Sequence, residues 1–173
     1  MDADLLPGPR ERVTIPEDLR DLPGDFAHCH LVEVRFADTD AMGHVNNASY
    51  LTYAEIARVA YYERVTGEPL PLPRGDHGAD EAMILAEIRI TYRSAAFYGE
   101  ILAVETRVDA IGRSSFRMVH RLTAPHSRHG PARLIAVADS VLVSYDYRIE
   151  RSIPVPASLV EAVEAFEGRG LRA

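Results

Sequence analysis

The sequence predicts an α+β fold in which one antiparallel sheet packs against one long helix. Residues 48–65, "ASYLTYAEIARVAYYERV", contain neither Gly nor Pro and repeat apolar or small side chains at steps of three and four, which is the period of a helix. After residue 80 the period falls to two, beginning with "ILAEIRITYRS", which is typical of an antiparallel strand with one buried face. The two periods together predict a two-layer arrangement of helix and sheet.

The first part of the chain predicts a strand followed by the long helix. The strand is "HLVEVRFA", residues 30–37, in which Val32, Val34 and Phe36 alternate with the other side chains. Gly67 follows the helix, in the position expected of a helix end. The small residues of the inner stripe, Ala54, Ala57 and Ala60, would let a sheet approach the helix closely.

The second part predicts four strands in succession and a short closing helix. The strands are residues 84–94, 101–110, 114–124 and 132–147, and the sequences "YGE", "IGR" and "PHSRHGP" separate them. Short turns predict an antiparallel meander. The closing helix is residues 157–168, ended by Gly168.

The expected organisation is one domain, residues 30–168, with an irregular N-terminal extension at 1–29 and a tail at 169–173. Four prolines interrupt the extension, and residues 66–80 form a loop rich in Pro and Gly. The extension lies on the surface or wraps a neighbouring subunit; the sequence leaves both open.

Composition excludes several classes of protein. The 173 residues carry a net charge of −7 and no Lys/Arg cluster, which argues against nucleic-acid binding. The single cysteine, Cys29, excludes an intrachain disulfide and a cysteine-based zinc site. No stretch approaches the roughly 20 apolar residues of a membrane span, and the N-terminus lacks the features of a signal peptide. We expect a cytoplasmic protein that needs no metal and no cofactor.

The chemistry-bearing residues concentrate between the first strand and the long helix, in "RFADTDAMGHVNNASY". Asp38 and Asp40 lie in the loop, and Asn46 or Asn47 stands at the N-cap position. The first N–H groups of a helix lack internal partners and carry positive potential. A carboxylate facing such an end could support acyl hydrolysis. The same pattern also describes a plain turn and cap, and on the pattern alone the cap is favoured.

A family resemblance changes that balance. Residues 34–58, "VRFADTDAMGHVNNASYLTYAEIAR", resemble the first strand, active loop and central helix of the 4-hydroxybenzoyl-CoA thioesterase-like family, above all its Asp-x-x-Gly-His-Val-Asn-Asn subgroup. "ITYRSAAFYGE" and "RSIPVPASLVEAV" extend the resemblance over about residues 30–168. It implies a hotdog fold, with the sheet wrapped around the long helix. It also implies a homodimer with acyl sites at the dimer interface, and a tetramer as a dimer of dimers.

The resemblance also implies roles for individual residues. Asp40 would be the catalytic carboxylate, acting as nucleophile or as general base. Backbone N–H groups of Asn47 and Gly43 would hold the carbonyl oxygen. His44 would orient Asp40 or contact pantetheine, although a hydrogen-bonded loop histidine is slightly favoured. Asn46 would contact substrate while capping the helix. Asp38 is expected to hold the loop.

Other residues and other functions stay open at this point. Arg93 and Arg113 are candidates for the CoA phosphates. Glu55 is a rival carboxylate, although Arg58 at i+3 favours a structural ion pair. Family members often carry Tyr or His at the position of Asn47.

The predicted function is hydrolysis of an acyl-CoA. CoA is favoured over acyl carrier protein as the thiol carrier, because this chain is acidic and acyl carrier protein is acidic too. An enoyl-CoA hydratase or dehydratase using His44, or a non-catalytic acyl-CoA-binding dimer, are the alternatives.

Overall fold

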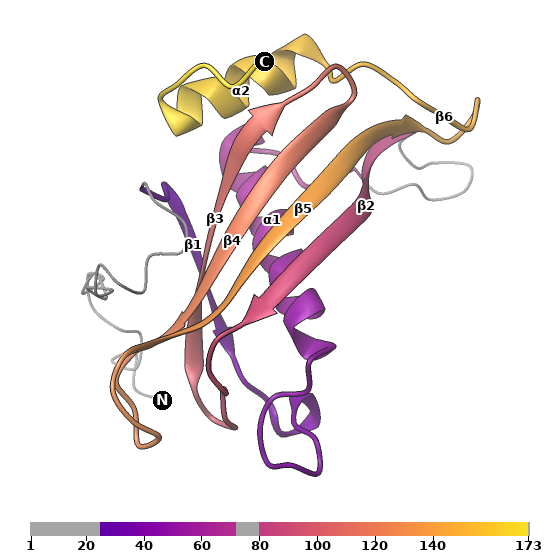
Figure 1. The fold of residues 1–173 in the computed structure, drawn as a ribbon. Helices are drawn as coiled ribbons and strands as arrows, with labels where there is room; N and C mark the ends of the chain where they lie inside the picture. Colours follow the sequence, from indigo (N-terminus) through magenta and orange to yellow (C-terminus); the bar gives the residue numbers. More distant parts are fainter. Residues whose placement is uncertain (1–24, 72–79, 173) are drawn as a thin grey trace, which may run out of the picture.

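A computed structural model describes residues 25–71 and 80–172, which form one sheet and two main helices (Figure 1). The elements are β1 (His28–Glu33), the 3-10 helix η3 (Phe36–Asp38), α1 (Ser49–Thr66), β2 (Glu81–Tyr92), β3 (Ile101–Ile111), β4 (Ser115–Ala124), β5 (Arg133–Asp146), β6 (Arg151–Ser152) and α2 (Ala157–Glu167). Every predicted strand and helix is present, and η3 and β6 are additional. No helix within the described residues is long and apolar enough to cross a membrane.

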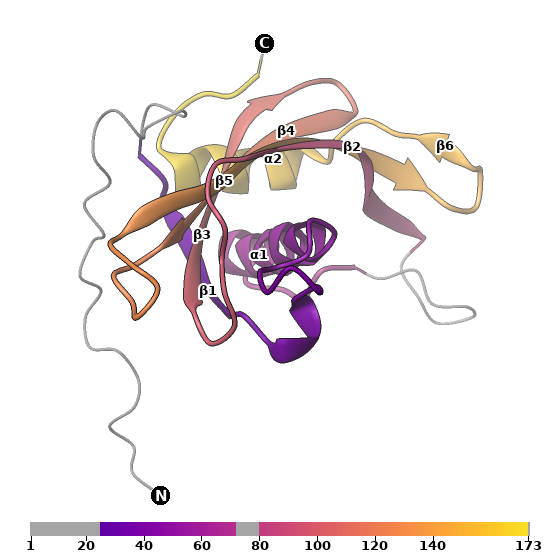
Figure 2. The ribbon, with the colours of Figure 1, turned by 60° about the horizontal axis from the view of Figure 1, so that its bottom comes forward.

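The sheet has the order β1-β3-β4-β5-β2, with β6 attached to β5, and all of its pairs are antiparallel. Figure 2 shows that the sheet curves around α1. The arrangement confirms the predicted α+β fold with a sheet wrapped around a long helix.

The predicted four-strand meander is wrong at β2. Only β3, β4 and β5 follow one another as neighbours, because β2 pairs with β5 instead of β3. Eight residues separate Tyr92 from Ile101, which is longer than the usual hairpin loop of about two to five residues. This crossing segment, residues 93–100, runs over the end of the sheet from β2 to β3.

Helix α1 matches its prediction closely. Gly67 ends it in the left-handed region with a φ of 74°, where glycine has no steric penalty. Its buried residues are Tyr50, Tyr53, Ala54, Ala57 and Tyr61. Ala54 and Ala57 are buried almost completely, as expected, so the middle of the helix lies close to the sheet. Ala60, the third alanine of the predicted stripe, is only partly buried.

Two apolar clusters fill the space between α1 and the sheet. One surrounds the start of α1 and includes Val34, Tyr53 and Leu102. The other surrounds its end and includes Tyr61, Phe116, Val160 and Leu171. Leu171 comes from the segment predicted as a tail, and its carbonyl accepts a hydrogen bond from the Ile111 N–H at 2.9 Å. The described part of the tail therefore packs on the domain.

The first two strands differ from their predictions in their limits and, in β2, in the alternation; β2 begins at Glu81 rather than at residue 84. β1 begins at His28 and ends at Glu33, and Phe36 is 78% exposed rather than in line with Val34. The chain leaves the strand there because Asp38 accepts the Arg35 N–H and closes a turn. β2 contains an irregularity between Leu85 and Glu87 that takes Ala86 out of the predicted alternation. Most of the predicted extension and loop, residues 1–24 and 72–79, lies outside the described residues.

Candidate functional site

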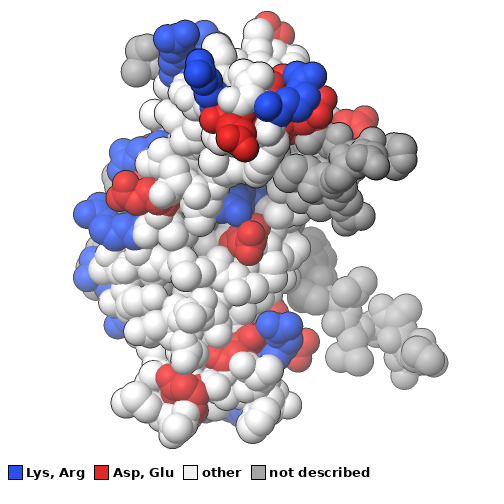
Figure 3. Space-filling view, turned by 90° about the vertical axis from the view of Figure 1, so that its right-hand side faces the viewer, with Lys and Arg blue, Asp and Glu red and all other residues white. Residues whose placement is uncertain are grey.

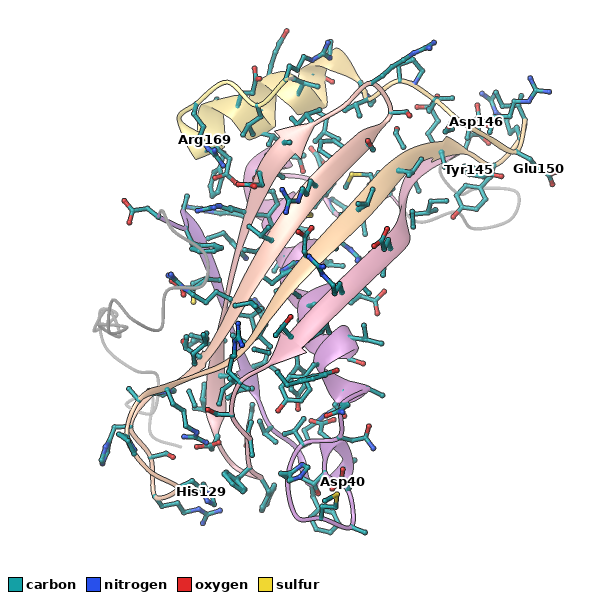
Figure 4. The ribbon with its side chains drawn as sticks, viewed as in Figure 1. Asp40, His129, Tyr145, Asp146, Glu150 and Arg169 are labelled. Carbon is teal, nitrogen blue, oxygen red and sulfur yellow. The ribbon has the colours of Figure 1, made fainter. Side chains whose placement is uncertain are left out.

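Asp40 lies in the loop between η3 and α1, residues 39–48, at the end of the molecule where α1 begins. Figure 4 shows it at the same end as His129, on a separate loop. The Asp40 loop closes on itself, because the Asp40 N–H donates to the His44 carbonyl and the Gly43 N–H donates to the Asp40 carbonyl, both at 3.0 Å. Gly43 has a φ of 82°, which explains the glycine. The backbone around Asp40 is therefore fixed by a tight turn.

The Asp40 carboxylate is only partly engaged. Its Oδ1 accepts the Met42 N–H at 2.9 Å, and the Nδ1 atom of His44 lies 3.9 Å from the same oxygen. Across residues 25–71 and 80–172, no group donates a hydrogen bond to Oδ2. About a quarter of the side chain, 26%, is exposed. This carboxylate is held in place and still has an oxygen available for a substrate or a water.

Asp38 is engaged on both oxygens and holds the loop. Its carboxylate accepts the Arg35 N–H, both the Nε–H and an Nη2–H of the Arg35 guanidinium, and the Tyr53 hydroxyl at 2.9 Å. The hydrogen bonds from the Arg35 side chain keep the pKa of Asp38 below its usual value. The Asp38 carbonyl also accepts the Asn46 N–H at 2.8 Å and the Ser49 hydroxyl at 3.0 Å. Asp38 thus ties the loop to the first turn of α1.

The segment just before α1 combines a side-chain cap with a backbone N–H that has no acceptor among the described residues. Asn46 Oδ1 accepts the Ala48 N–H at 2.9 Å, so Asn46 caps the turn just before α1. The residue at the N-cap position itself is Ala48, which has no side-chain cap, and this corrects the predicted cap position. Among the described residues, nothing accepts the N–H of Asn47, and its carbonyl accepts the Tyr92 hydroxyl at 3.0 Å.

The structure groups most of the predicted site residues and separates one. Gly43, His44 and the two asparagines share the loop with Asp40. Arg93 directly follows β2, where its N–H donates to the Ile135 carbonyl at 2.8 Å. Arg113 lies in the turn between β3 and β4, at the opposite end of the sheet beside α2 (Figure 1). Within one chain, Arg113 is therefore remote from Asp40.

The rival carboxylate, Glu55, lies farther along α1. It is eight residues past Asn47, which corresponds to about 12 Å along a helix axis. Its side chain is 64% exposed, and its Oε1 is 3.4 Å from the Arg58 Nη2. The Arg58 side chain is largely buried, and burial lowers its pKa. The ion pair expected from the i,i+3 spacing is present.

Sequence reasoning missed the groups that brace the loop from the crossing segment. The Glu100 carboxylate accepts the Phe97 N–H, the Ser127 hydroxyl and the Arg133 guanidinium, the last at 2.7 Å. Burial raises the pKa of Glu100, but the hydrogen bonds from Arg133 and Ser127 outweigh burial and leave the pKa lowered. "YGE" was interpretable only as a turn. Ser127 and Arg133, which donate to the Glu100 carboxylate, lie 27 and 33 residues further along the chain, so no local signal could reveal these contacts.

The crossing segment in turn contacts the Asp40 loop and the chain that leads into it. The Val45 N–H donates to the Ala96 carbonyl, and the Val34 N–H donates to the Glu100 carbonyl, both at 2.8 Å. The loop is therefore supported by Asp38 on one side and by residues 96–100 on the other.

The described residues hold no group of three or more His, Cys, Asp or Glu side chains that could bind a metal ion. What they do offer is a carboxylate with a free oxygen, and an unpaired N–H two residues before the positive end of a helix. A carboxylate and an oxyanion donor are the groups that acyl transfer requires.

Comparison with known proteins identifies thioesterases and a CoA hydrolase as the proteins similar to this chain. A family model described as the thioesterase-like superfamily matches residues 34–163. The 1,4-dihydroxy-2-naphthoyl-CoA hydrolase of Synechococcus elongatus is 27% identical over 128 residues, which cover 73% of this chain and 87% of the relative.

Solved structures agree with the family match. A thioesterase from Thermus thermophilus, complexed with coenzyme A and Zn, is 33% identical with a TM-score of 0.67, and the match covers 84% of this chain and 98% of that one. A mutant 4-hydroxybenzoyl CoA thioesterase, complexed with 4-hydroxybenzoyl CoA, has a TM-score of 0.67 at 21% identity, covering 79% and 97% of the two chains. At that identity it supports the fold alone. These matches confirm the resemblance and the hotdog fold predicted from the sequence.

Proposed function

The chain belongs to the thioesterase-like superfamily, and we propose that it hydrolyses the thioester bond of an acyl-CoA to a free acid and CoA. The observation that carries the proposal is the Asp40 carboxylate, with one oxygen free, in the loop that leads to the unpaired Asn47 N–H. The name of the cyanobacterial relative, a CoA thioester hydrolase, supports the same reaction.

The proposed mechanism assigns one task to each group. The Asn47 N–H donates a hydrogen bond to the thioester carbonyl oxygen and stabilises the negative charge that develops there. Asp40 either attacks the carbonyl carbon or removes a proton from the attacking water. The carbon–sulfur bond then breaks. If Asp40 acts as base, the proton that it took from water passes to the CoA thiolate, and the free acid is formed directly. If Asp40 attacks, a water then hydrolyses the acyl–Asp40 anhydride, which frees the acid, restores the carboxylate and supplies the proton for the CoA thiolate. The Gly43 N–H already donates to the Asp40 carbonyl, so the proposal assigns oxyanion binding to Asn47 and turn formation to Gly43.

The remaining predicted residues have supporting parts in the proposal. His44 borders Asp40: its Nδ1 lies 3.9 Å from Asp40 Oδ1 and 3.3 Å from the Val45 carbonyl, which is its hydrogen-bond partner. Asn46 keeps the first turn in shape and borders the substrate. Arg93, at the Asp40 end of the sheet, is the candidate for a CoA phosphate, whereas the position of Arg113 fits only a substrate held by a partner chain.

We also propose that the protein works as a homodimer in the cytoplasm. Among the described strands, β2 pairs with β5 along one edge, and no strand pairs along its other edge. Figure 3 views this side and shows few charged side chains across its middle. Large apolar side chains are exposed on α1 and β2, namely Leu51, Ile56, Leu85 and Tyr92. A face with exposed apolar side chains and few charges, beside an open strand edge, favours pairing with a second copy. A tetramer would be a dimer of such dimers.

The test is thiol release from a panel of aliphatic and aromatic acyl-CoAs. Wild type is compared with Asp40→Asn and with Glu55→Gln as the matched carboxylate control. We expect Asp40→Asn to lower kcat by about 10²–10⁴-fold, the range for a general acid or base, with an unchanged melting temperature. Glu55→Gln should stay within about twofold, since this side chain is exposed and distant. Equal rates for wild type and Asp40→Asn would exclude Asp40 as the catalytic group.

Two further assays separate the alternatives. Hydration of an enoyl-CoA by the wild type, without thiol release, would support the hydratase. Tight acyl-CoA binding without turnover would support the non-catalytic dimer. A monomer in light scattering at assay concentration would contradict the proposed dimer.

A further inference from the structure

The face of the sheet that points away from α1, which we call the outer face, carries buried arginines. Side chains alternate between the two faces of a strand. In β4, Met118 and Leu122 belong to the core clusters, so Val119 and Arg121 point outward. The register places Arg107 of β3 opposite Val119, and it therefore lies on the same face. Val119 is 1% exposed, and Arg107 and Arg121 are 9% and 8% exposed, so this part of the outer face is covered.

Phe26 holds the start of the described chain on the outer face. The guanidinium carbons of Arg107 and Arg121 lie over its ring, 4.8 and 4.5 Å from the ring centroid, which is within the range of a cation–π interaction. Arg107 also donates to the Asp25 carbonyl at 3.5 Å. Glu105 accepts the Arg121 Nε–H at 2.7 Å and so fixes the guanidinium beneath the ring. The chain therefore reaches residue 25 against the sheet.

Beyond Phe26 the outer face continues along β5 as a row of valines. In the strand register Val137 lies opposite Arg121, and Val141 lies opposite Arg117. Val143 occupies the next outward position of β5. All three valines are partly buried. Among the described residues, both main helices place their buried apolar side chains in the inner clusters, so the row lacks a covering helix. An apolar sheet face is normally covered by another layer.

The chain itself supplies a segment that is long enough to cover this row. Twenty-four residues precede Asp25, and an extended chain of that length spans up to about 80 Å. The 14 residues of β5 extend over only about 46 Å. The segment also carries apolar side chains that suit the valines: Leu5, Leu6, Val13, Ile15, Leu19 and Leu22.

We propose that residues 1–24 lie across the outer face of their own sheet, with Phe26 as the anchor. The sequence left open whether the extension covers its own surface or a neighbouring subunit. The contacts of Phe26 favour its own surface, because the ring and both arginines belong to one chain. The outer face is then closed to sheet-to-sheet packing between copies, which leaves the α1 side and the β2 edge for the proposed dimer.

The test measures how fast a thiol reagent reaches the outer face. Val141→Cys is introduced into the full-length chain with Cys29→Ser, and its labelling rate is compared with and without Phe26→Ala. We expect Phe26→Ala to raise the rate about tenfold, the factor expected for losing two cation–π interactions, because the cover must open locally before the reagent reacts. The control is Ile149→Cys in the turn after β5, where the side chain is 56% exposed. It should label fast, at one rate in both backgrounds.

Two conservative substitutions show whether the aromatic ring is the anchor. Phe26→Tyr keeps the ring over the arginines, and Val141→Cys should stay protected. Phe26→Leu keeps an apolar side chain without a ring, and the labelling rate should rise as it does with Phe26→Ala. Equal labelling rates in the Tyr and Leu variants, at unchanged melting temperature, would refute the anchor.

Trypsin identifies the segment that provides the cover. Cleavage after Arg12 should be slow while Phe26 is present and about tenfold faster in Phe26→Ala, since cleavage follows the population of the open form. Cleavage at one rate in both chains would contradict the proposal.

The remaining outcomes also decide the question. Fast labelling of Val141→Cys with Phe26 intact means that the outer face is open. Protection that disappears when the protein is diluted to monomers means that a second copy covers the face. Either result overturns the inference, whereas protection at every concentration supports it. None of these measurements uses a substrate, so the inference and the proposed hydrolysis can fail independently.

Discussion

The hydroxyl of Tyr53 offers a sharp test of how the Asp40 loop is held. Tyr53 is 1% exposed, and its hydroxyl donates to Asp38 Oδ2 at 2.9 Å. Tyr53→Phe removes this oxygen and leaves the ring packed in the core. The acceptor is a carboxylate that also binds the Arg35 backbone and guanidinium. The variant therefore isolates one charge-assisted hydrogen bond at the base of the loop.

The expected loss can be worked from these contacts. A hydrogen bond to a charged group contributes about 1.5–3 kcal/mol. Asp38 keeps its bonds from Arg35, so it is not left unsatisfied, and the lower end of that range applies. We expect Tyr53→Phe to lose about 1.5 kcal/mol of unfolding free energy. For a chain of this size that corresponds to about 3–6 °C in Tm.

The assay is denaturant unfolding at neutral pH, with Tyr98→Phe as the control for removing an exposed phenol oxygen. The control should unfold like the wild type. The loss should also depend on pH. Because the folded pKa of Asp38 is lowered, the charged contribution is present above the pKa of an unfolded aspartate and disappears as pH falls through the folded pKa. The difference between Tyr53→Phe and wild type should therefore shrink in acid. A neutral-pH loss below about 0.5 kcal/mol, or an equal loss in the control, would refute the reasoning.

Two further predictions concern buried polar groups. Burial lowers the pKa of His120 to about 3 from 6.5. Below pH 6.5 the unfolded chain therefore binds a proton that the folded chain does not. The free energy of unfolding should decrease as the pH is lowered, by up to about 1.4 kcal/mol per pH unit. His120→Gln should flatten this slope in a series of urea titrations, and the exposed His126→Gln should leave it unchanged. Glu100→Gln should lower the free energy of unfolding by about 2–3 kcal/mol. This is somewhat less than the loss on breaking a fully buried ion pair, because the Arg133 side chain is 16% exposed. Calorimetry that shows no loss of stability relative to Glu55→Gln would contradict this prediction.

The sequence predicts helices here better than it predicts strand neighbours. The limits of α1 follow from a run without Gly or Pro and from Gly67, which are both local features. The pairing of β2 with β5 brings Ile88 beside Ser140, and no local pattern reports on such a distant contact. Alternation therefore identifies the strands of this sheet without fixing their order.

In the candidate site, too, local sequence reveals less than the contacts between distant residues. Asp38 and Asp40 are indistinguishable by local pattern, and the resemblance rather than spacing singled out Asp40. Their difference becomes physical only in three dimensions, where Tyr53, 15 residues away, donates to Asp38. Tyr92 was visible as part of a family-like strand, but its partner at Asn47 is 45 residues distant.

The Glu100–Arg133 pair changes how a mutational survey of this protein should be interpreted. It joins the crossing segment to the start of β5. Carbonyl groups of the crossing segment accept hydrogen bonds from the N–H groups of Val34 and Val45, which precede and follow Asp40 in the sequence. A random library scored for lost turnover would therefore yield hits at Glu100 and Arg133, although neither has a part in the proposed chemistry. Scoring abundance alongside turnover would sort such supporting positions from Asp40, whose loss should leave the amount of folded protein intact.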